Sequence, residues 1–296
     1  MHELENLRKK KLLQFVLLLL LDLIIIAGAV FAAINIYQST KDSESAIQAF
    51  FCITVIFIFI SSFFKNKIAK DFEKSVKVTC INNIIANILG SRGEIVWREA
   101  TRVNPFVFIP KYERGEEVKE SQLFSFNGYS EDDIFTGEYS ASKVNITELI
   151  LTVGKNTTVF QGSFITIQVD KEFQGHTIIG KNNYTITKGL EKLKLPVKEF
   201  AKKYDVYTNN FDEAGKILNS DLVNFLMEMK YATKIACYGN KVVAAIHVNK
   251  DMFKLGSLFK PVEDQKQFMK FTEDFNWVIN IIDKLKELIL IPAQNL

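Results

Sequence analysis

The chain begins with two apolar stretches: residues 12–37 read LLQFVLLLLLDLIIIAGAVFAAINIY, and residues 46–64 read AIQAFFCITVIFIFISSFF. The short polar segment 38–45 separates them. A helix of about 20 residues crosses the hydrocarbon core of a bilayer, and both stretches reach that length. Buried helices of soluble proteins rarely remain apolar over such a distance without a polar face. The two stretches therefore predict a transmembrane hairpin within residues 1–64, with helices at about 12–37 and 46–64.

Basic residues flank this hairpin on one side. Residues 8–11 are all basic, and three lysines lie within residues 65–70, whereas the loop 38–45 has one lysine and two acidic residues. Because basic flanks stay on the cytoplasmic side, we expect both termini in the cytoplasm and the loop outside. A cleaved signal peptide is the alternative for the first stretch, but its apolar core is too long and a second span follows at once. The frequent Asn, Ile and Lys suit a bacterial genome of low GC content, so we expect a multi-pass protein of a bacterial inner membrane.

Asp22 is the one charged residue within the two stretches. An acid near the centre of a spanning helix costs about 2.5–3.5 kcal/mol, so it usually faces water or a polar partner. Thr54 falls at a similar depth when counted from the cytoplasmic end of the second stretch. Two interpretations of these intramembrane polar residues stay open: a proton or ion relay, or a protonated Asp22 that bonds to Thr54 or to another copy of the chain.

The residues after the hairpin predict an α+β fold. Apolar residues recur every four positions over 65–90, which predicts an amphipathic connecting helix. Segment 123–190 is rich in β-branched and aromatic residues with turns between, which favours a mixed, mainly antiparallel sheet made of several short strands, including separate ones at 157–169 and 176–180. Helices are expected at 212–230, with a cap at Asn219 or Ser220, and at 262–290. Segment 233–249 predicts a hairpin that turns at Gly239-Asn240. The cytoplasmic α+β domain then covers residues 91–296.

Composition limits the partners. The net charge is +3, with acidic and basic residues interspersed and no basic patch with aromatic residues between, so no nucleic-acid partner is expected. Cys52, Cys80 and Cys237 are far apart in the sequence and predict no disulfide framework. The expected partner is the lipid bilayer, and a homo-oligomer stays open.

Several motifs resemble one family when they are taken in order. They are SQLF at 121–124, DDIFTG at 132–137, FQGSF at 160–164, FQG at 173–175, and the segment from Glu199 to Leu218. Together they are similar to the DUF3137 family, bacterial proteins of unknown function, although Tyr204 stands where the family pattern has Phe. The resemblance implies a two-helix membrane hairpin before a cytoplasmic α+β domain, and structural roles for Phe135, Gly137, Phe160, Gly162 and Gly175. It also implies a LemA-like membrane protein as partner, but no activity and no catalytic residue.

The sequence contains no catalytic motif. His2, His176 and His247 lack metal-ligand spacing, and the phosphate-binding, dinucleotide-binding and nucleophile-elbow patterns are missing. We therefore expect no cofactor and favour a protein that is not an enzyme. The acidic segment 131–133 is the best polar cluster, in which Asp132 and Asp133 are candidate ligands for Mg²⁺ or Ca²⁺. Alternatively, these side chains only cap backbone N–H groups of a turn before a strand.

Two hypotheses for function follow from these observations. The first is an inner-membrane protein whose cytoplasmic domain binds or scaffolds a membrane or envelope-associated partner. The alternative is an enzyme at the cytoplasmic face of the membrane, with a divalent ion held by Asp132 and Asp133.

Overall fold

The structure is a computed structural model, which describes residues 1–99, 115–154, 157–181 and 183–290. The chain divides into two compact units. The helical unit consists of Met1–Ile81 and Leu255–Lys270. The sheet unit consists of Asn82–Lys254 and Phe271–Leu296. Each unit is described by itself below.

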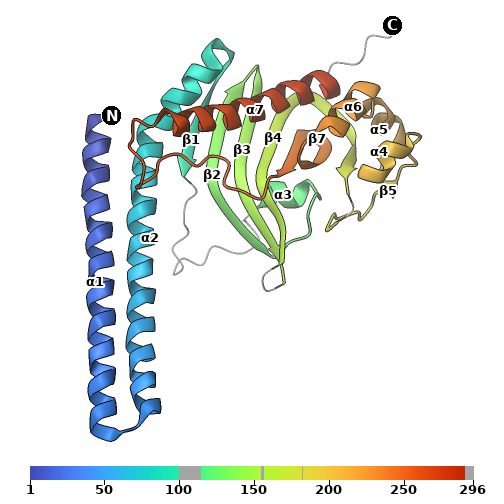
Figure 1. The fold of residues 1–296 in the computed structure, drawn as a ribbon. Helices are drawn as coiled ribbons and strands as arrows, with labels where there is room; N and C mark the ends of the chain where they lie inside the picture. Colours follow the sequence, from blue (N-terminus) through green and yellow to red (C-terminus); the bar gives the residue numbers. More distant parts are fainter. Residues whose placement is uncertain (100–114, 155–156, 182, 291–296) are drawn as a thin grey trace. The chain divides into compact units, whose positions relative to one another are not determined.

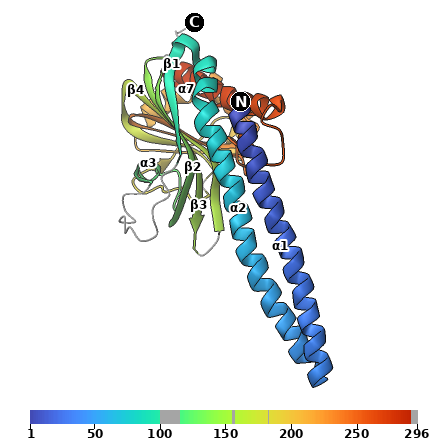
Figure 2. The same ribbon diagram turned by 90° about the vertical axis from the view of Figure 1, so that its left-hand side faces the viewer.

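Two long antiparallel helices form the helical unit (Figures 1 and 2). Helix α1 is His2–Thr40, and α2 is Ser43–Leu89, of which residues up to Ile81 belong to this unit. Both are long and apolar enough to cross a membrane. Their large apolar side chains point outward, so that Phe31 and Phe59 are 68% and 77% exposed. Residues 12–37 and 46–64, where the sequence predicted spanning helices, lie within α1 and α2, and the helix predicted at 65–90 is the continuation of α2 to Leu89.

Segment Leu255–Lys270 packs against the first turns of α1 in the helical unit. Glu5 is the centre of this contact, because its carboxylate binds the Arg8 guanidinium at 2.7 Å and accepts a 3.0 Å hydrogen bond from the Val262 N–H. Arg8 also donates a 3.1 Å hydrogen bond to the carbonyl oxygen of Leu258. These charge-assisted bonds fix the segment to the end of α1 that carries the N-terminus.

In the sheet unit, the described residues form one open sheet of seven strands, whose observed pairings are antiparallel (Figure 1). The strand order is β1-β2-β3-β4-β6-β5, and β7 pairs with β4. The strands are β1 Gly93–Glu99, β2 Gly128–Tyr139, β3 Ser142–Val153, β4 Thr157–Gly180, β5 Glu191–Lys192, β6 Asp205–Thr208 and β7 Ala232–His247. Short helices α3 Glu116–Glu120, α4 Lys198–Lys203, α5 Phe211–Ile217 and α6 Ser220–Glu228 connect them, and α7 is Gln265–Leu290. The predicted α+β fold is therefore confirmed.

Two strands differ from the sequence prediction. The segments expected as separate strands at 157–169 and 176–180 form the single strand β4 of 24 residues. The hairpin expected at 233–249 is wrong, because β7 continues through Gly239 and pairs with β4 along both halves. Register shifts between Gln168 and Phe173, and between Phe173 and Thr177, place extra β4 residues opposite Gly239. Such irregularities bend both strands together, so the chain does not need to reverse at Gly239.

The helix expected at 212–230 is divided into α5 and α6. The Asn219 side chain accepts a hydrogen bond from Leu222 N–H and so starts α6, as the sequence had indicated for this position. The amide of Asn219 also donates a 2.7 Å hydrogen bond to the carbonyl oxygen of Leu288 near the end of α7. The expected helix at 262–290 is confirmed by α7.

The sheet carries apolar side chains on both faces, because successive residues of a strand point to opposite sides. On one face, the Phe135 ring lies 4.6 Å from the ring of Phe253 and 5.3 Å from that of Phe275 on α7. On the other face, the rings of Phe160 and Phe124 are 4.8 Å apart within a buried cluster. The sheet therefore separates two cores, and a functional group on one face is shielded from the other.

Candidate metal centre

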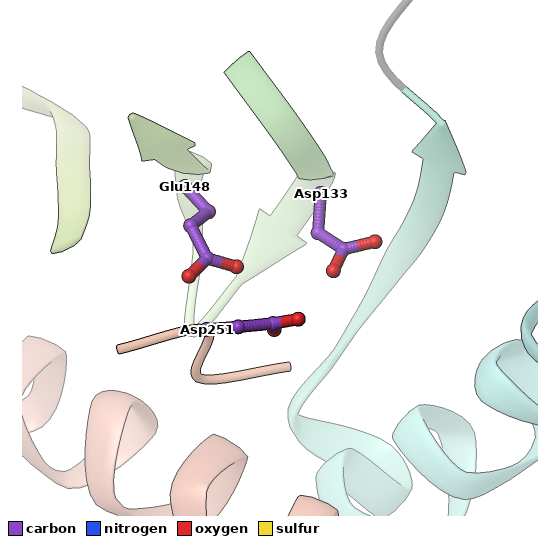
Figure 3. A group of neighbouring side chains, drawn as sticks. All are labelled: Asp133, Glu148 and Asp251. Atoms are coloured by element: carbon purple, nitrogen blue, oxygen red, sulfur yellow. The ribbon is translucent and has the colours of Figure 1, made fainter. Parts of the chain in front are cut away.

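Three carboxylates that are distant in the sequence meet in the sheet unit (Figure 3). Asp133 lies on β2, Glu148 on β3, and Asp251 on the segment after β7. One oxygen from each residue lies within 4.8 Å of the others. Figure 3 shows the three side chains arranged around one common space. We refer to this group as the acidic centre.

Asp133 enters the centre because the pairing of β2 with β3 is irregular between Glu131 and Ile134. Such a bulge re-aims side chains that would otherwise alternate. Asp133 is 1% exposed as a result, whereas its neighbour Asp132 is exposed. The Trp97 indole donates a 2.7 Å hydrogen bond from Nε1 to Asp133 Oδ1 and holds the carboxylate in place.

Glu148 is the second buried member of the centre. It pairs with Ser163 of β4 in the middle of the sheet and is 5% exposed. Its Oε1 accepts a 3.0 Å hydrogen bond from the Met252 N–H. Its Oε2 is buried and has no hydrogen-bond partner among the residues that the structure describes. Since a buried polar atom without a partner is costly, this oxygen calls for a proton or a cation.

The raised pKa of Glu148 agrees with the need for a proton or a cation at its carboxylate. Burial, and then the neighbouring carboxylates with Asp251 foremost, raise the pKa of Glu148 to about 8. The charged form is disfavoured by desolvation and by like charges together. A bound cation would reverse both effects and let Glu148 ionise at neutral pH.

The donor set of the centre indicates the class of cation. All three ligands offer carboxylate oxygen, which suits Mg²⁺, Ca²⁺ or Mn²⁺ and disfavours metals that prefer sulfur or imidazole. Oxygens bound to one Ca²⁺ at about 2.3–2.6 Å can be up to about 5 Å apart, which matches the observed spread. Asp251 is exposed, so the centre opens to solvent on the side of this residue.

The sequence identified one of the three members. Asp133 belongs to the centre, but its predicted companion Asp132 is exposed and lies outside the group. Both residues lie within β2 and do not form a turn before it. Glu148 and Asp251 were missed. Glu148 had one signal, because it is the acidic residue in a part of β3, residues 146–153, that is otherwise apolar or β-branched. Nothing in the local sequence of Asp251 marks it.

The two polar residues predicted to lie within the membrane, Asp22 and Thr54, belong to the helical unit and are not brought together. Asp22 Oδ2 binds the Lys65 ammonium at 2.6 Å, and both side chains are largely buried. Thr54 Oγ1 has no hydrogen-bond partner among the described residues, and it lies about 16 Å from Lys65 along α2 at the helical rise. The short connection at Lys41 sets this register, because it ends α1 in a left-handed conformation only two residues before α2 begins.

Two motif glycines, Gly137 and Gly162, lie where strands approach closely, and Gly175 lies against Asn209 and Asn210 before α5. A Cβ on Gly137 would overlap the carbonyl oxygen of Glu94 on β1. A Cβ on Gly162, whose φ is 154°, would overlap the carbonyl oxygen of Ile246 on β7. Gly175 N–H donates a 2.9 Å hydrogen bond to Glu213 of α5. These glycines allow close packing of backbone, and none contributes a group to the acidic centre.

Fold and site together define a protein with two helices long enough to cross a membrane and an open antiparallel α+β unit that carries a carboxylate cluster. Residues 158–287 match the family described as "Protein of unknown function (DUF3137)", which supports the resemblance seen in the motifs. The match contains the motifs from Phe160 onward, whereas those at 121–124 and 132–137 precede it. Of the acidic centre, Asp251 alone lies within the match. No curated protein and no solved structure matches the chain.

Proposed function

We propose that this chain is a bacterial inner-membrane protein that binds a divalent cation in its cytoplasmic sheet unit. The observation that carries the proposal is the buried Glu148, whose Oε2 has no hydrogen-bond partner among the described residues and whose carboxylate lies beside those of Asp133 and Asp251. An apolar position would cost less than an acid here unless a cation compensates the charge. Asp132 is not a ligand in this proposal.

The membrane placement is supported by the two long helices and their flanks. Both helices satisfy their own backbone hydrogen bonds and expose apolar side chains, as a lipid environment requires. Basic residues lie in the first turns of α1, before its apolar part, and follow the apolar part of α2, whereas the connection between the helices has no excess of basic residues. The sheet unit then faces the cytoplasm.

The geometry favours binding over catalysis. Two of the carboxylates are held by specific donors, Trp97 for Asp133 and the Met252 backbone for Glu148. A cation would therefore join β2 and β3 to the segment that follows β7. Three carboxylates leave coordination positions of a hard cation for water or for an oxygen of a partner.

Thermal unfolding of the full chain tests the proposal. The protein is reconstituted in lipid nanodiscs, stripped with EDTA, and melted with and without Mg²⁺, Mn²⁺ or Ca²⁺. A cation at about 100 times its Kd stabilises the folded state by about 2.7 kcal/mol, which raises the Tm by several degrees.

Two variants make the test specific. Glu148→Gln keeps the shape of the side chain and removes its charge, so it should abolish the shift. Asp132→Asn is the matched control, because this exposed neighbour lies outside the centre, and it should keep the shift. If none of the three cations raises the Tm of the unmodified chain, the proposal is wrong and Glu148 is a protonated structural residue.

We keep partner binding as a second proposal. A role in binding or scaffolding a membrane or envelope-associated partner, LemA-like or otherwise, is supported by the candidate membrane helices and by the lack of a catalytic motif in the sequence. A cation at the acidic centre would be compatible with it, since an oxygen of the partner could complete the coordination.

A further inference from the structure

A second site lies on the opposite face of the sheet. A cavity of about 500 Å³ is bordered by the two ends of β7, by β4 and by the end of α4. Phe160 and Ala245 belong to the core cluster on this face. Glu148 points the other way, because its strand neighbour Leu149 is the residue that joins this cluster. The cavity and the acidic centre are therefore separate.

The cavity has an apolar floor. The rings of Phe124, Phe160 and Tyr204 line it, together with Ala245. Its volume falls within the range of about 300–1,000 Å³ that is usual for small-molecule pockets. The bend of β4 and β7 at Gly239 creates this space, since it brings residues of both ends of β7 to one cavity.

The polar part of the cavity is basic. Lys181, Lys202, Lys203 and Lys234 line it, and none of the described lining residues is acidic. Lys202 forms an exposed pair with Glu199, whereas Lys181 forms no ion pair with any residue that the structure describes. The cavity therefore combines an apolar floor with an excess of positive charge.

Lys234 is a half-buried cation in the cavity lining. Its ammonium donates to the carbonyl oxygens of Leu123 and Asn183, at 3.1 and 2.6 Å, and to Thr185 Oγ1 at 2.8 Å. All three acceptors are neutral. Nζ also lies 4.5 Å above the centroid of the Phe124 ring. Burial lowers the pKa of Lys234 to about 8, as expected for a cation that lacks a compensating anion.

Lys203 fixes a second charge nearby. Its ammonium contacts the carbonyl oxygens of Leu226, Met227 and Met229, at 3.2, 3.0 and 3.3 Å. These are the carbonyl groups at the end of α6, a position that favours cations. Lys203 and Lys234 thus provide a preorganised positive field, while the exposed Lys181 forms no side-chain hydrogen bond with the residues that the structure describes.

We propose that this cavity binds a small organic anion, which has an aromatic or aliphatic body and one carboxylate or phosphate group. The body would lie on the floor formed by Phe124 and Phe160, where burial of apolar surface is favourable. The anionic group would lie at the basic side, where Lys181 donates to it. A charge-assisted hydrogen bond of this type is roughly twice as strong as a neutral one.

Isothermal titration calorimetry with the full chain in phosphatidylcholine nanodiscs tests this proposal. The probes are 2-naphthoate, 2-naphthyl phosphate and the neutral isostere 2-naphthamide. Both anions should bind, and 2-naphthamide should bind at least about tenfold more weakly, which corresponds to one charge-assisted hydrogen bond. Equal binding of 2-naphthoate and 2-naphthamide, or no binding of either anion, would overturn the proposal.

Three variants distinguish binding in the cavity from general attraction to surface charge. Lys181→Glu should weaken 2-naphthoate at least about tenfold, whereas Lys198→Glu makes the same change of charge on α4, outside the cavity lining, and should leave the affinity unchanged. Ala232→Phe places a ring at an exposed lining position and should block the probe without removing a hydrogen bond. Equal loss in both lysine variants would assign the binding to surface charge and contradict the proposal.

A further titration distinguishes a lipid ligand from a soluble one. If the natural ligand is an anionic lipid, nanodiscs that contain phosphatidylglycerol should compete with 2-naphthyl phosphate. If the ligand is a soluble anion, its affinity should be the same in both lipids. Inorganic phosphate alone should compete weakly in either case, because it lacks the apolar body.

Discussion

The indole Nε1 of Trp97 donates a 2.7 Å hydrogen bond to Oδ1 of Asp133 in the interior of the sheet unit. This bond joins strand β1 to β2 and holds the carboxylate that lies beside Glu148 and Asp251. A buried carboxylate that is held in this way can serve as a preorganised ligand. The consequences for the stability of the cation-free and cation-bound protein can be measured.

Trp97→Phe tests this positioning role. The variant keeps an aromatic ring but removes the donor, so a buried carboxylate oxygen loses its partner. We expect a loss of about 1–3 kcal/mol in the free energy of unfolding without cation. The loss should be smaller with saturating cation, because the metal compensates the same carboxylate. Far-UV circular dichroism during thermal unfolding measures both values, and an equal loss in both states would show that Trp97 acts only in packing.

The pH dependence of the cation-free protein follows from Glu148. Its pKa of about 8 in the folded state lies above the ordinary value of 4.5. Below pH 4.5, both the folded and the unfolded state carry the proton. Between the two pKa values only the folded state keeps it, so this contribution to stability falls as pH rises, by up to about 1.4 kcal/mol per pH unit.

Glu148→Gln should remove that slope between pH 5 and 8, because the amide does not titrate. The affinity for a divalent cation should change in the opposite direction and increase with pH, since binding releases the proton of Glu148. Melting curves over this pH range, with and without cation, measure both effects. A slope that persists in the glutamine variant would assign the pH dependence to other groups.

A double-mutant cycle tests the pairing of Asp22 with Lys65. Lys65→Met leaves a carboxylate without its cation in a mostly buried position, which should destabilise the hairpin by up to about 3 kcal/mol. The double variant Asp22→Asn with Lys65→Met should cost less than the Lys65→Met variant, so the two effects are not additive. Thermal unfolding in nanodiscs measures the cycle. Additive effects would show that the 2.6 Å contact contributes little.

Co-purification tests the partner proposal. Membranes that contain the C-terminally tagged chain are crosslinked briefly, solubilised in mild detergent and analysed by mass spectrometry. We expect one stoichiometric membrane partner, and Glu148→Gln should reduce its recovery if the cation completes the interface. An isolated chain would contradict the scaffolding role. If the Glu148→Gln variant recovers as much partner as the unmodified chain, partner binding does not depend on the acidic centre.

Local sequence patterns were sufficient to predict which segments form helices and which form strands. The apolar stretches at 12–37 and 46–64 are continuous over the length of a span, so periodicity and length identify helices without knowledge of neighbours. Asn219 marks the division between α5 and α6 because capping depends on residues close in sequence. The Gly239-Asn240 pair misled the prediction, since its turn signal is overridden by pairing with β4 on both sides.

The acidic centre shows the limit of local information. Asp132 and Asp133 are equivalent in the sequence, and only the bulge in β2 buries one and exposes the other. Glu148 and Asp251 approach Asp133 because β3 pairs with β2, while β7, which precedes Asp251, reaches the sheet by pairing with β4. The basic cavity likewise depends on the bend of β7, which brings Ala232 and His247 to one space.

The amino-acid sequence by itself determined the two apolar helices, the α+β class and the resemblance to the DUF3137 family, because composition, periodicity and short motifs are properties of contiguous residues. Only the tertiary structure decided which acids form the carboxylate cluster, which strands are bent, and that Asp22 meets Lys65. The physical reason is that burial and pairing depend on residues distant in the chain. A carboxylate becomes a candidate ligand when the fold removes it from water and places other carboxylates beside it.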